Sequence, residues 1–377
     1  MSSAANSSRQ ASENRQPSAP AARQSVAEET EFLTLDATRG TAEARRDSRF
    51  LEILAGGLQQ CELKGQAVLI GVSGGADSVA LLCGTQTLAV EYNCHVVAAH
   101  LNHSLRGDAS NEDARFVADL AERLQIPCHI GHRDVSQEAD ASGVGLEEAA
   151  RRARYEFLVE AADRANCSMI ATAHTADDQV ETLLHHIVRG SGLGGLRGMP
   201  FTRPLTQNVR LVRPLLEARR EQIEAWVTEL GQAYCVDATN TDTRMTRNRI
   251  RHELLPLLRS QFNSNIDGCL LKLGEQAAAA HDVIMTLAEE RLSEALIEQT
   301  PRVVRLRRQI FLSAPEHLRR ECFVRLWCQQ DWPRQAMGFR EWDRLSRLVE
   351  TSESATLPGR IQCHVRREVM TLQSPDC

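Results

Sequence analysis

The sequence predicts an α/β protein: a doubly wound, mostly parallel β-sheet followed by a mainly helical C-terminal domain. Short apolar segments typical of buried strands alternate with amphipathic helical segments over the first part of the chain. Each of three such strands ends in a cluster of polar residues. Beyond Gly198 prolines interrupt the pattern, and longer helical segments follow. Alternation of strands and helices favours parallel pairing, because the crossover helices cover both faces of the sheet.

The expected strands are the apolar segments at 68–72, 95–103, 126–131 and 167–175. The expected helices of the same domain lie at 50–63, 79–92, 111–124, 146–165 and 177–190. Parallel strands bring their carboxyl ends to one edge of the sheet, where ligands bind in this class of fold. The polar ends SGGADS, HLNHSLR and AHTADD are therefore expected to converge on one crevice.

Composition divides the chain into four parts. Residues 1–45 are rich in Ser, Ala, Gln, Arg and Glu without sustained periodicity, which predicts a disordered extension. We expect a nucleotide-binding domain at 46–219, a helical domain at 220–350, and a short strand pair or tail at 351–377. We expect the helical domain to bind nucleic acid, because arginines cluster in it.

Hydropathy, charge and cysteine content argue against several classes of protein. No segment reaches the roughly 18 apolar residues of a membrane span, and no signal peptide opens the chain, so a cytoplasmic protein without a membrane partner is expected. The 11 cysteines form no CxxC pair, which argues against a zinc ribbon or a redox pair. Net charge is −6, yet Arg302 to Arg347 holds eleven arginines against five acidic residues. A genome that favours Arg over Lys explains the composition but not the clustering, which leaves a polyanionic partner open.

The SGGADS turn, from Ser73 to Ser78, is the main candidate site. Gly74 and Gly75 allow a positive φ and close approach of a ligand to the backbone. The helix that begins near Ala76 offers free N–H groups to an anion, and Asp77 adds a carboxylate for a divalent cation. The candidate phosphate-binding residues are Ser73, Gly74, Gly75, Ala76, Asp77 and Ser78. An ordinary strand-to-helix turn is the alternative.

Two other nucleotide motifs fit poorly. A Walker A loop needs GK[ST], and neither Lys64 nor Lys272 is followed by Ser or Thr. Gly190, Gly192 and Gly195 satisfy GxGxxG, but they follow a helix rather than a strand. We interpret those glycines as a flexible loop over a substrate.

The segment HTADD places His174, Asp177 and Asp178 at the end of an expected strand. Thr175 and Asp178 have the spacing of a helix capping box, which accounts for one carboxylate without any function. A metal-binding role for one carboxylate is the alternative, since Mg²⁺ bound with a nucleotide takes one or two carboxylates. Glu181 lies one turn beyond Asp177 and is expected on the same face.

Three arginines at a spacing of three and four, Arg244, Arg247 and Arg251, share one face of an expected helix. They form either a solvated helix face or a set of phosphate contacts.

Five segments in order resemble the tRNA(Ile)-lysidine synthases, members of the N-type (PP-loop) ATP pyrophosphatases. They are SGGADS, HLNHSLR, EEAARRARY, HTADDQVET with RGSGLGGLRGM, and DATNTDTRMTRNRIRHELLP, and they span roughly residues 50 to 275. The first motif alone would indicate only the superfamily. The resemblance implies ligation of free lysine to the wobble cytidine of an isoleucine tRNA with a CAU anticodon, with ATP and Mg²⁺ required. The cytosine oxygen is first adenylated, and the lysine ε-amine then displaces AMP.

The same resemblance implies roles for individual residues. Ser73 to Ser78 and His100 would bind ATP, with Asp77 and Asp177 as Mg²⁺ ligands. Asp77, His174 and Asp178 would be the catalytic residues, and the Gly190 to Gly198 loop would cover them. His100 to Arg106 would line the nucleotide crevice. The residues expected to contact the tRNA are Arg247, Asn248, Arg249 and Arg251.

Two other functions compete. A tRNA thiolase of the same superfamily commonly relies on paired cysteines, and the sequence has no CxxC. A non-catalytic RNA-binding protein on a nucleotide-binding fold is disfavoured by the intact SGGADS and HTADD segments. A homodimer is compatible with the sequence, which does not fix the oligomeric state.

Overall fold

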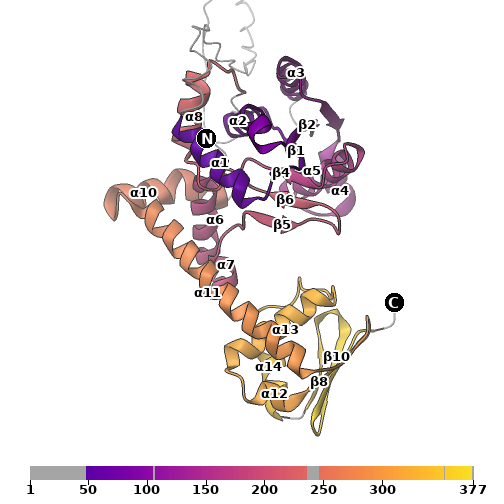
Figure 1. The fold of residues 1–377 in the computed structure, drawn as a ribbon. Helices are drawn as coiled ribbons and strands as arrows, with labels where there is room; N and C mark the ends of the chain where they lie inside the picture. The colour runs from indigo at the N-terminus through magenta and orange to yellow at the C-terminus, as the bar shows by residue number, and fades with distance from the viewer. Residues whose placement is uncertain (1–47, 105–106, 236–245, 352, 376–377) are drawn as a thin grey trace, which may run out of the picture.

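The chain forms two units joined by one long helix (Figure 1). The structure is a computed structural model, and it describes residues 48–104, 107–235, 246–351 and 353–375. The expected disordered extension at 1–45 lies outside these ranges, as do Leu105, Arg106 and Arg244. No helix in the described ranges is long and apolar enough to cross a bilayer.

The first unit is built on a six-stranded sheet with the order β3-β2-β1-β4-β6-β5. All neighbouring strands pair in parallel except β5, which pairs antiparallel with β6 at the edge. The strands are β1 (Ala67–Gly71), β2 (His95–Asn102), β3 (Cys128–His132), β4 (Met169–Ala171), β5 (Thr202–Pro204) and β6 (Arg210–Val212). The predicted doubly wound, mostly parallel sheet is confirmed.

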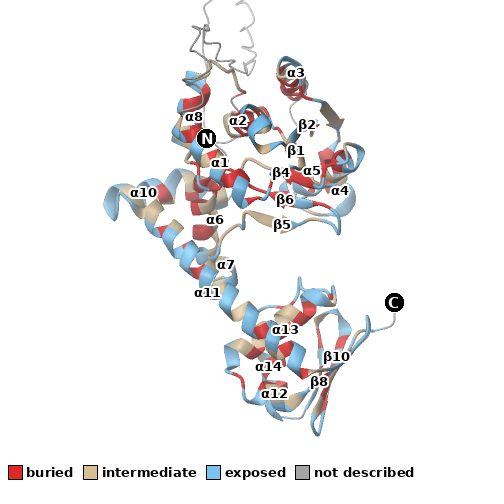
Figure 2. Ribbon diagram, in the orientation of Figure 1, coloured by how far each residue is buried: buried red, intermediate tan, exposed pale blue. Residues whose placement is uncertain are grey.

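Alternation along the central strand explains why helices cover both faces. Val68 and Ile70 belong to the core beneath α1, α2, α3 and α8, whereas Leu69 belongs to the core beneath α4 and α5. Figure 2 shows the buried residues along the strands and on the inward sides of these helices. The helices of this unit are α1 (Arg49–Gln60), α2 (Ala76–Tyr92), α3 (Asp108–Arg123), α4 (Val135–Ser142), α5 (Leu146–Arg164), α6 (Ala176–Val188), α7 (Leu193–Leu196) and α8 (Arg220–Glu229).

The expected boundary near residue 220 does not coincide with a change in packing. Trp226 of α8 stacks on Phe50 of α1 with ring centroids 4.6 Å apart, and both residues are buried in the core of the first unit. The strands β5 and β6 have no signal in the sequence, because three-residue strands are too short to show a periodicity.

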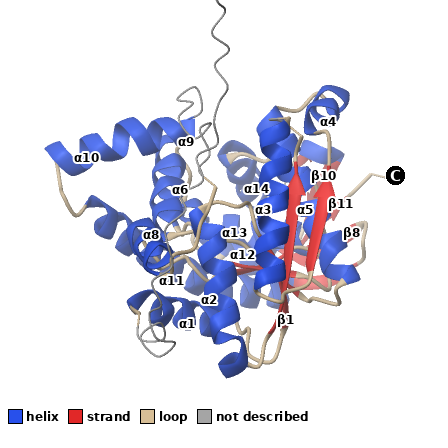
Figure 3. Cartoon of the chain, turned by 90° about the horizontal axis from the view of Figure 1, so that it is seen from above, coloured by secondary structure: helices blue, strands red, loops and turns tan. Residues whose placement is uncertain are grey.

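A helical segment connects the two units. It comprises α9 (Thr246–Arg249), a π-helical turn η2 (Ile250–Leu254), α10 (Leu255–Gln261) and α11 (Ile266–Ala295). Seen from above, α9 lies beside α6, and the two elements are in contact (Figure 3). The 30 residues of α11 span about 45 Å at the usual helical rise.

The C-terminal unit contains a five-stranded antiparallel sheet of order β7-β8-β11-β10-β9. Its elements are β7 (Leu296–Gln299), β8 (Val303–Arg307), α12 (Arg308–Leu312), α13 (Glu316–Gln329), α14 (Phe339–Thr351), β9 (Ser354–Leu357), a 3₁₀ turn η3 (Pro358–Arg360), β10 (Ile361–Arg366) and β11 (Val369–Gln373).

The expected strand pair at 351–377 is therefore wrong in extent: three strands lie there, and β7 and β8 join them from the segment expected to be helical. In β8, Val304 and Leu306 are buried while Arg305 and Arg307 are exposed, which is the alternation of a half-buried strand. The surrounding arginines hide this short pattern within a longer charged segment.

Candidate active site

The SGGADS turn, Ser73 to Ser78, connects β1 to α2 and is held by its two serines; it is the candidate phosphate loop. Gly74 has φ +95°, and Gly75 is the extended residue that precedes the helix. The Ser73 amide donates to Ser78 Oγ at 3.1 Å, and Ser78 Oγ donates to the Gly75 carbonyl at 2.9 Å. These bonds fix a tight turn from which the N–H groups of the first helical turn project without intrahelical acceptors. The loop therefore has the geometry of an anion cradle.

Gly74 allows a second segment to approach this loop. The Cys235 amide donates to the Gly74 carbonyl at 2.9 Å, and a Cβ on Gly74 would lie 3.1 Å from Cys235 Sγ. A side chain at this position would combine a strained φ with a tight contact. The contact between Gly74 and Cys235 joins residues that are 161 positions apart in the chain, and no local sequence pattern predicts it.

Asp77 lies in the first turn of α2 and is short of partners. Its Oδ1 is buried and has no hydrogen-bond partner among the described residues. Its Oδ2 lies 3.6 Å from Arg220 Nε. Burial raises the pKa of Asp77 to about 6, against the attraction of Arg220, and Asp178 also raises it. A buried carboxylate oxygen without a donor fits a cation ligand.

Histidines close the site from two strands. His100 of β2 is buried, and its Nδ1 donates to the Val72 carbonyl at 2.8 Å, which ties the end of β1 to its neighbour. Burial lowers the pKa of His100. His174 follows β4, and its Nδ1 lies 2.9 Å from Thr172 Oγ1. Burial lowers the pKa of His174 to about 3, although Asp178 opposes this, so the imidazole is neutral at physiological pH.

Asp178 has the predicted capping role. The Thr175 amide donates to Asp178 Oδ2 at 2.9 Å, and the Asp178 amide donates back to Thr175 Oγ1 at 3.3 Å. Asp177 also makes a structural contact, because its Oδ2 accepts from the Arg220 amide at 2.8 Å. Burial raises the pKa of Asp178, but Arg247 and the Thr175 amide outweigh it, and the net shift is downward.

Two of the three arginines expected to contact tRNA, Arg247 and Arg251, are paired with carboxylates of α6. Arg247 donates from Nε to Glu181 Oε2 at 3.0 Å, and Arg251 donates from Nη2 to the same oxygen at 3.1 Å. Both guanidinium groups also lie 3.4 Å from Asp178 Oδ1. Glu181 is buried and cannot be solvated by bulk water, so the two guanidinium groups compensate its negative charge. Glu181 thus acts together with Asp178 rather than with Asp177.

The remaining residues of that segment have different surroundings. Arg249 is exposed and lies 3.5 Å from Glu253 one turn along the helix. Asn248 has an interaction within the protein, and Arg244 lies outside the described residues. Contact of Arg247, Asn248, Arg249 and Arg251 with tRNA stays a prediction.

Arg220 belongs to the candidate site although no pattern in the sequence indicates it. It lies at the start of α8, 3.6 Å from Asp77 Oδ2 and 3.7 Å from Asp178 Oδ1. The same guanidinium therefore links the phosphate loop to the HTADD segment. An arginine at the start of an amphipathic helix gives no local signal of this role, because the contact depends on how α8 packs against α2.

The glycine-rich segment after α6 is anchored rather than free. Gln179 Nε2 donates to the Met199 carbonyl at 2.8 Å, and the Met199 amide donates back to Gln179 Oε1 at 2.7 Å. The Gly195 carbonyl lies 2.6 Å from His186 Nδ1, and the segment contains the short helix α7. Its expected role as a cover over the site stays a prediction.

The three polar strand ends converge as predicted. β1 lies between β2 and β4, and contacts among His100, Val72, Asp77, Arg220 and Asp178 connect the three ends. Among the described residues no group of three or more His, Cys, Asp and Glu side chains has the arrangement of a metal site. The donor set at Asp77 fits Mg²⁺ only as a partner of phosphate, since that ion needs few protein carboxylates.

The chain matches the PP-loop domain family over residues 45–258, more than half of its length. It is 33% identical over 323 residues to the tRNA(Ile)-lysidine synthase of Rhodopirellula baltica, with 75% of this chain and 79% of that protein covered. It is 37% identical to the enzyme of that name from Geobacter sulfurreducens, over 82% of this chain and 64% of the relative. For Clostridioides difficile the identity is 35%, over 61% of this chain and 49% of the relative. The chain thus spans between half and four-fifths of these relatives.

Among solved structures, the fold is similar to that of a U34-tRNA thiolase from Methanococcus maripaludis. The TM-score is 0.51 at 15% identity, over 62% of this chain and 80% of that chain. At this identity the likeness shows a shared fold only. The phosphate loop, the converging strand ends and the match to named relatives point to one conclusion: the chain belongs to the tRNA(Ile)-lysidine synthase family of PP-loop proteins.

Proposed function

We propose that this chain ligates lysine to the wobble cytidine of an isoleucine tRNA with a CAU anticodon, at the expense of ATP. The observation that carries the proposal is the phosphate loop with Asp77 beside it, within a chain whose relatives bear the name tRNA(Ile)-lysidine synthase. The cytosine carbonyl oxygen forms a bond to the α-phosphorus of ATP, and the bond to pyrophosphate breaks. The lysine ε-amine then bonds to the base carbon, AMP leaves with the oxygen, and the amine gives up a proton.

The chain's own residues support the first step through position and charge. The first turn of α2 and the bends at Gly74 and Gly75 would hold the phosphates. Asp77, with Asp177 as a second candidate, would hold a Mg²⁺ that neutralises phosphate charge when bound. Arg220 lies within 4 Å of both Asp77 and Asp178, and we propose that it also contacts a phosphate oxygen. His174 adds no positive charge at neutral pH, because its burial disfavours protonation.

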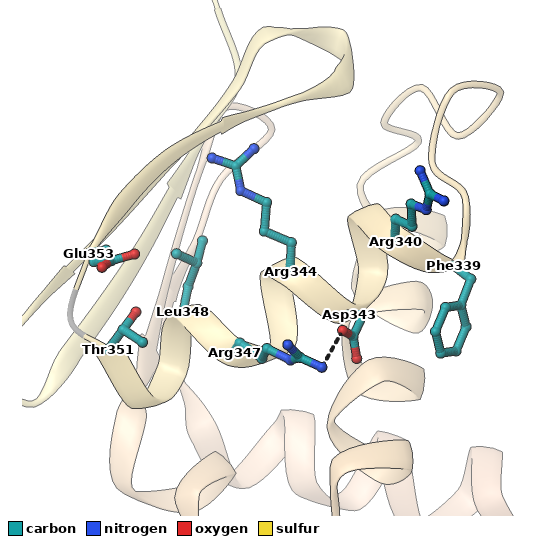
Figure 4. Close-up of a pocket in the computed structure, with 8 residues that line it drawn as sticks. All are labelled: Phe339, Arg340, Asp343, Arg344, Arg347, Leu348, Thr351 and Glu353. Carbon is teal, nitrogen blue, oxygen red and sulfur yellow. Dashed lines mark ion pairs between the residues drawn. The ribbon is translucent and has the colours of Figure 1, made fainter.

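Contact with tRNA beyond the anticodon is proposed for the C-terminal unit. Figure 4 shows Arg340, Arg344 and Arg347 on α14 around a cavity of about 340 Å³, with Phe339 at the start of the helix. Arg347 pairs with Asp343 at 2.9 Å, whereas Arg340 and Arg344 have no ion pair among the described residues. Exposed arginines beside an exposed aromatic ring suit an RNA backbone and an unstacked base.

A cytoplasmic location and a homodimer remain predictions from the sequence. The thiolase alternative has little support in the sequence, which contains no CxxC pair.

The test is substrate dependence. Release of AMP and pyrophosphate should require the CAU-anticodon tRNA and lysine together, and mass spectrometry of digested tRNA should show lysine added to the wobble cytidine. A tRNA with a CAU anticodon of the methionine type is the control. Turnover that ignores lysine but needs a sulfur donor would overturn the proposal in favour of thiolation.

A further inference from the structure

Arginines gather around Tyr155 of α5, outside the phosphate loop. The guanidinium carbons of Arg151, Arg154 and Arg203 lie 5.2, 5.9 and 5.4 Å from the centre of the Tyr155 ring. Each contact with the ring is favourable by itself. Three cations around one ring also repel one another, so the cluster needs a negative charge nearby.

No carboxylate in the described part of the chain supplies that charge within ion-pair distance. Among the described residues, Arg151, Arg154 and Arg203 have no carboxylate within 4 Å, whereas the adjacent Arg152 pairs with Glu156 at 3.7 Å. A fourth arginine, Arg213, is only 3% exposed. It donates from Nη1 to the Pro200 carbonyl at 2.7 Å, and its Nε has no partner among the described residues. This buried cation with an unused donor adds positive charge that the protein compensates poorly.

The cluster has a hollow in which such an anion fits. Arg151, Tyr155 and Arg203 line a cavity of about 390 Å³ between α5 and β5, which Val144 and Leu205 border with apolar groups. Both elements are labelled in Figure 1. Arg152, Glu148 and Glu156 also line the cavity, so it is not uniformly positive.

The cluster extends to the active edge of the sheet. Arg213 directly follows β6, His174 lies three residues beyond β4, and these two strands are neighbours in the sheet. Arg213 and Arg154 are both near enough to lower the pKa of His174, after the larger effect of burial. The arginines therefore extend outward from His174, which is expected to be a catalytic residue.

We infer that Arg151 and Arg203, which line the cavity beside Tyr155, bind the sugar–phosphate backbone of the RNA next to the nucleotide that is modified. The inference rests on the proposed function and names a contact surface for its RNA substrate. Guanidinium forks match phosphate oxygens, and aromatic rings with nearby arginines are typical of single-stranded RNA sites.

A polyanion suits this cluster better than the lysine substrate does. The carboxylate of free lysine carries one negative charge and is accompanied by its own α-ammonium group. That pair would leave several guanidinium groups without compensation, whereas successive phosphates supply one charge each. The acidic Glu148 is compatible with a backbone that passes over the arginines.

The experiment measures tRNA affinity over a range of salt concentrations for the full-length chain. In the variant Arg151→Ala/Arg203→Ala, the tRNA Kd should rise roughly ten-fold or more, since each contact is charge-assisted. The slope of log K against log salt should fall by about 1.4 for two lost phosphate contacts on a single strand. The matched control is Arg164→Ala at the other end of α5, where an exposed arginine pairs with Glu160 at 3.3 Å.

Chemically modified RNA locates the contact. An uncharged methylphosphonate is placed at one position of the anticodon loop at a time, and its effect is measured with both proteins. At one or two positions the loss of affinity should be large for the unaltered chain and small for the double variant. If the loss of affinity caused by the methylphosphonate adds to the loss caused by the double variant at every position, the inference is wrong. A raised KM for lysine with unchanged tRNA affinity would also overturn it and assign the cluster to a carboxylate. Because binding is read without turnover, failure of ligation would leave this measurement intact.

Discussion

Arg251 donates from Nε and Nη2 to the two carboxylate oxygens of Glu181, a fork-to-fork contact between the π-helical turn η2 and helix α6. Arg247 shares the same carboxylate, which is only 2% exposed. The contact fixes the segment that follows the undescribed residues 236–245 against the helix that carries Asp177 and Asp178. The carboxylate of Glu181 therefore determines the position of Arg247 and Arg251 in the 246–254 segment.

Replacing Glu181 should destabilise the protein through this contact. Glu181→Gln removes the negative charge and leaves two guanidinium groups close together, so we expect a loss of about 2 kcal/mol in the free energy of unfolding. Urea titration at pH 7 measures it. The matched control is Glu253→Gln, which removes the exposed pair with Arg249 and should cost less than about 0.5 kcal/mol. If both variants lose the same free energy of unfolding, the burial of Glu181 does not strengthen its ion pairs.

Asp77 is expected to be required for adenylation but not for RNA binding. Asp77→Asn keeps the shape of the side chain and removes the charge that would hold Mg²⁺ beside the phosphates. Pyrophosphate release should fall by at least about 100-fold, as for loss of a main electrostatic contact. The tRNA Kd from filter binding should change less than about two-fold. Near-normal pyrophosphate release by the variant would remove Asp77 from the metal role.

The raised pKa of Asp77 predicts a pH dependence of stability. Burial raises this pKa to about 6 in the folded state, above the ordinary value of 3.8, so the folded protein binds the proton more tightly than the unfolded chain. The resulting stability is present below about pH 4 and is lost as pH rises through 6. Relative to Asp77→Asn, the unaltered chain should lose about 2 to 3 kcal/mol between pH 4 and pH 7.5 in magnesium-free buffer. Urea midpoints at five pH values test this, and parallel pH profiles of the two proteins would contradict it.

Gly74 should be needed for ATP affinity as well as for stability. Gly74→Ala must adopt φ +95° and approach Cys235 Sγ at 3.1 Å, so we expect a loss of roughly 1 to 2 kcal/mol and a shifted loop. ATP affinity by calorimetry should fall at least about ten-fold. Gly65→Ala is the control, because Gly65 also has a positive φ but its Cβ would meet no atom within 4 Å. It should lose about 1 kcal/mol of stability and keep normal ATP affinity. If both variants bind ATP alike, the loop geometry at Gly74 is not what binds the phosphates.

The arginines of α14 should matter for whole tRNA and not for its anticodon arm. Because α11 spans about 45 Å, Arg340→Ala/Arg344→Ala should weaken binding of full-length tRNA while an isolated anticodon stem-loop binds normally. The salt slope for full-length tRNA should fall by about 1 to 2. Arg366→Ala is the control, an exposed arginine on β10, whose alternate residues pack on the core. An equal effect on both RNAs would place the contact elsewhere.

Much of the α/β unit could be predicted from sequence, because its signals are local. The buried strands, the SGGADS turn and the capping box of Thr175 and Asp178 each depend on residues within one or two turns of each other. The convergence of three strand ends follows from parallel topology alone. The C-terminal sheet was less predictable, since β7 and β8 are short and lie among charged residues.

By itself, the sequence determined the fold class, the strand-to-helix turn at Ser73 to Ser78 and the family, since motif spacing and hydrophobic periodicity are properties of the chain. Only the tertiary structure decided which charged groups are in contact. Glu181 pairs with Arg247 and Arg251, and Arg220 lies between Asp77 and Asp178. Arginines surround the ring of Tyr155. These partners are up to about 140 residues apart, and several carboxylates compete for each arginine. The choice among them depends on how the packed helices are set against the sheet, which no local pattern encodes.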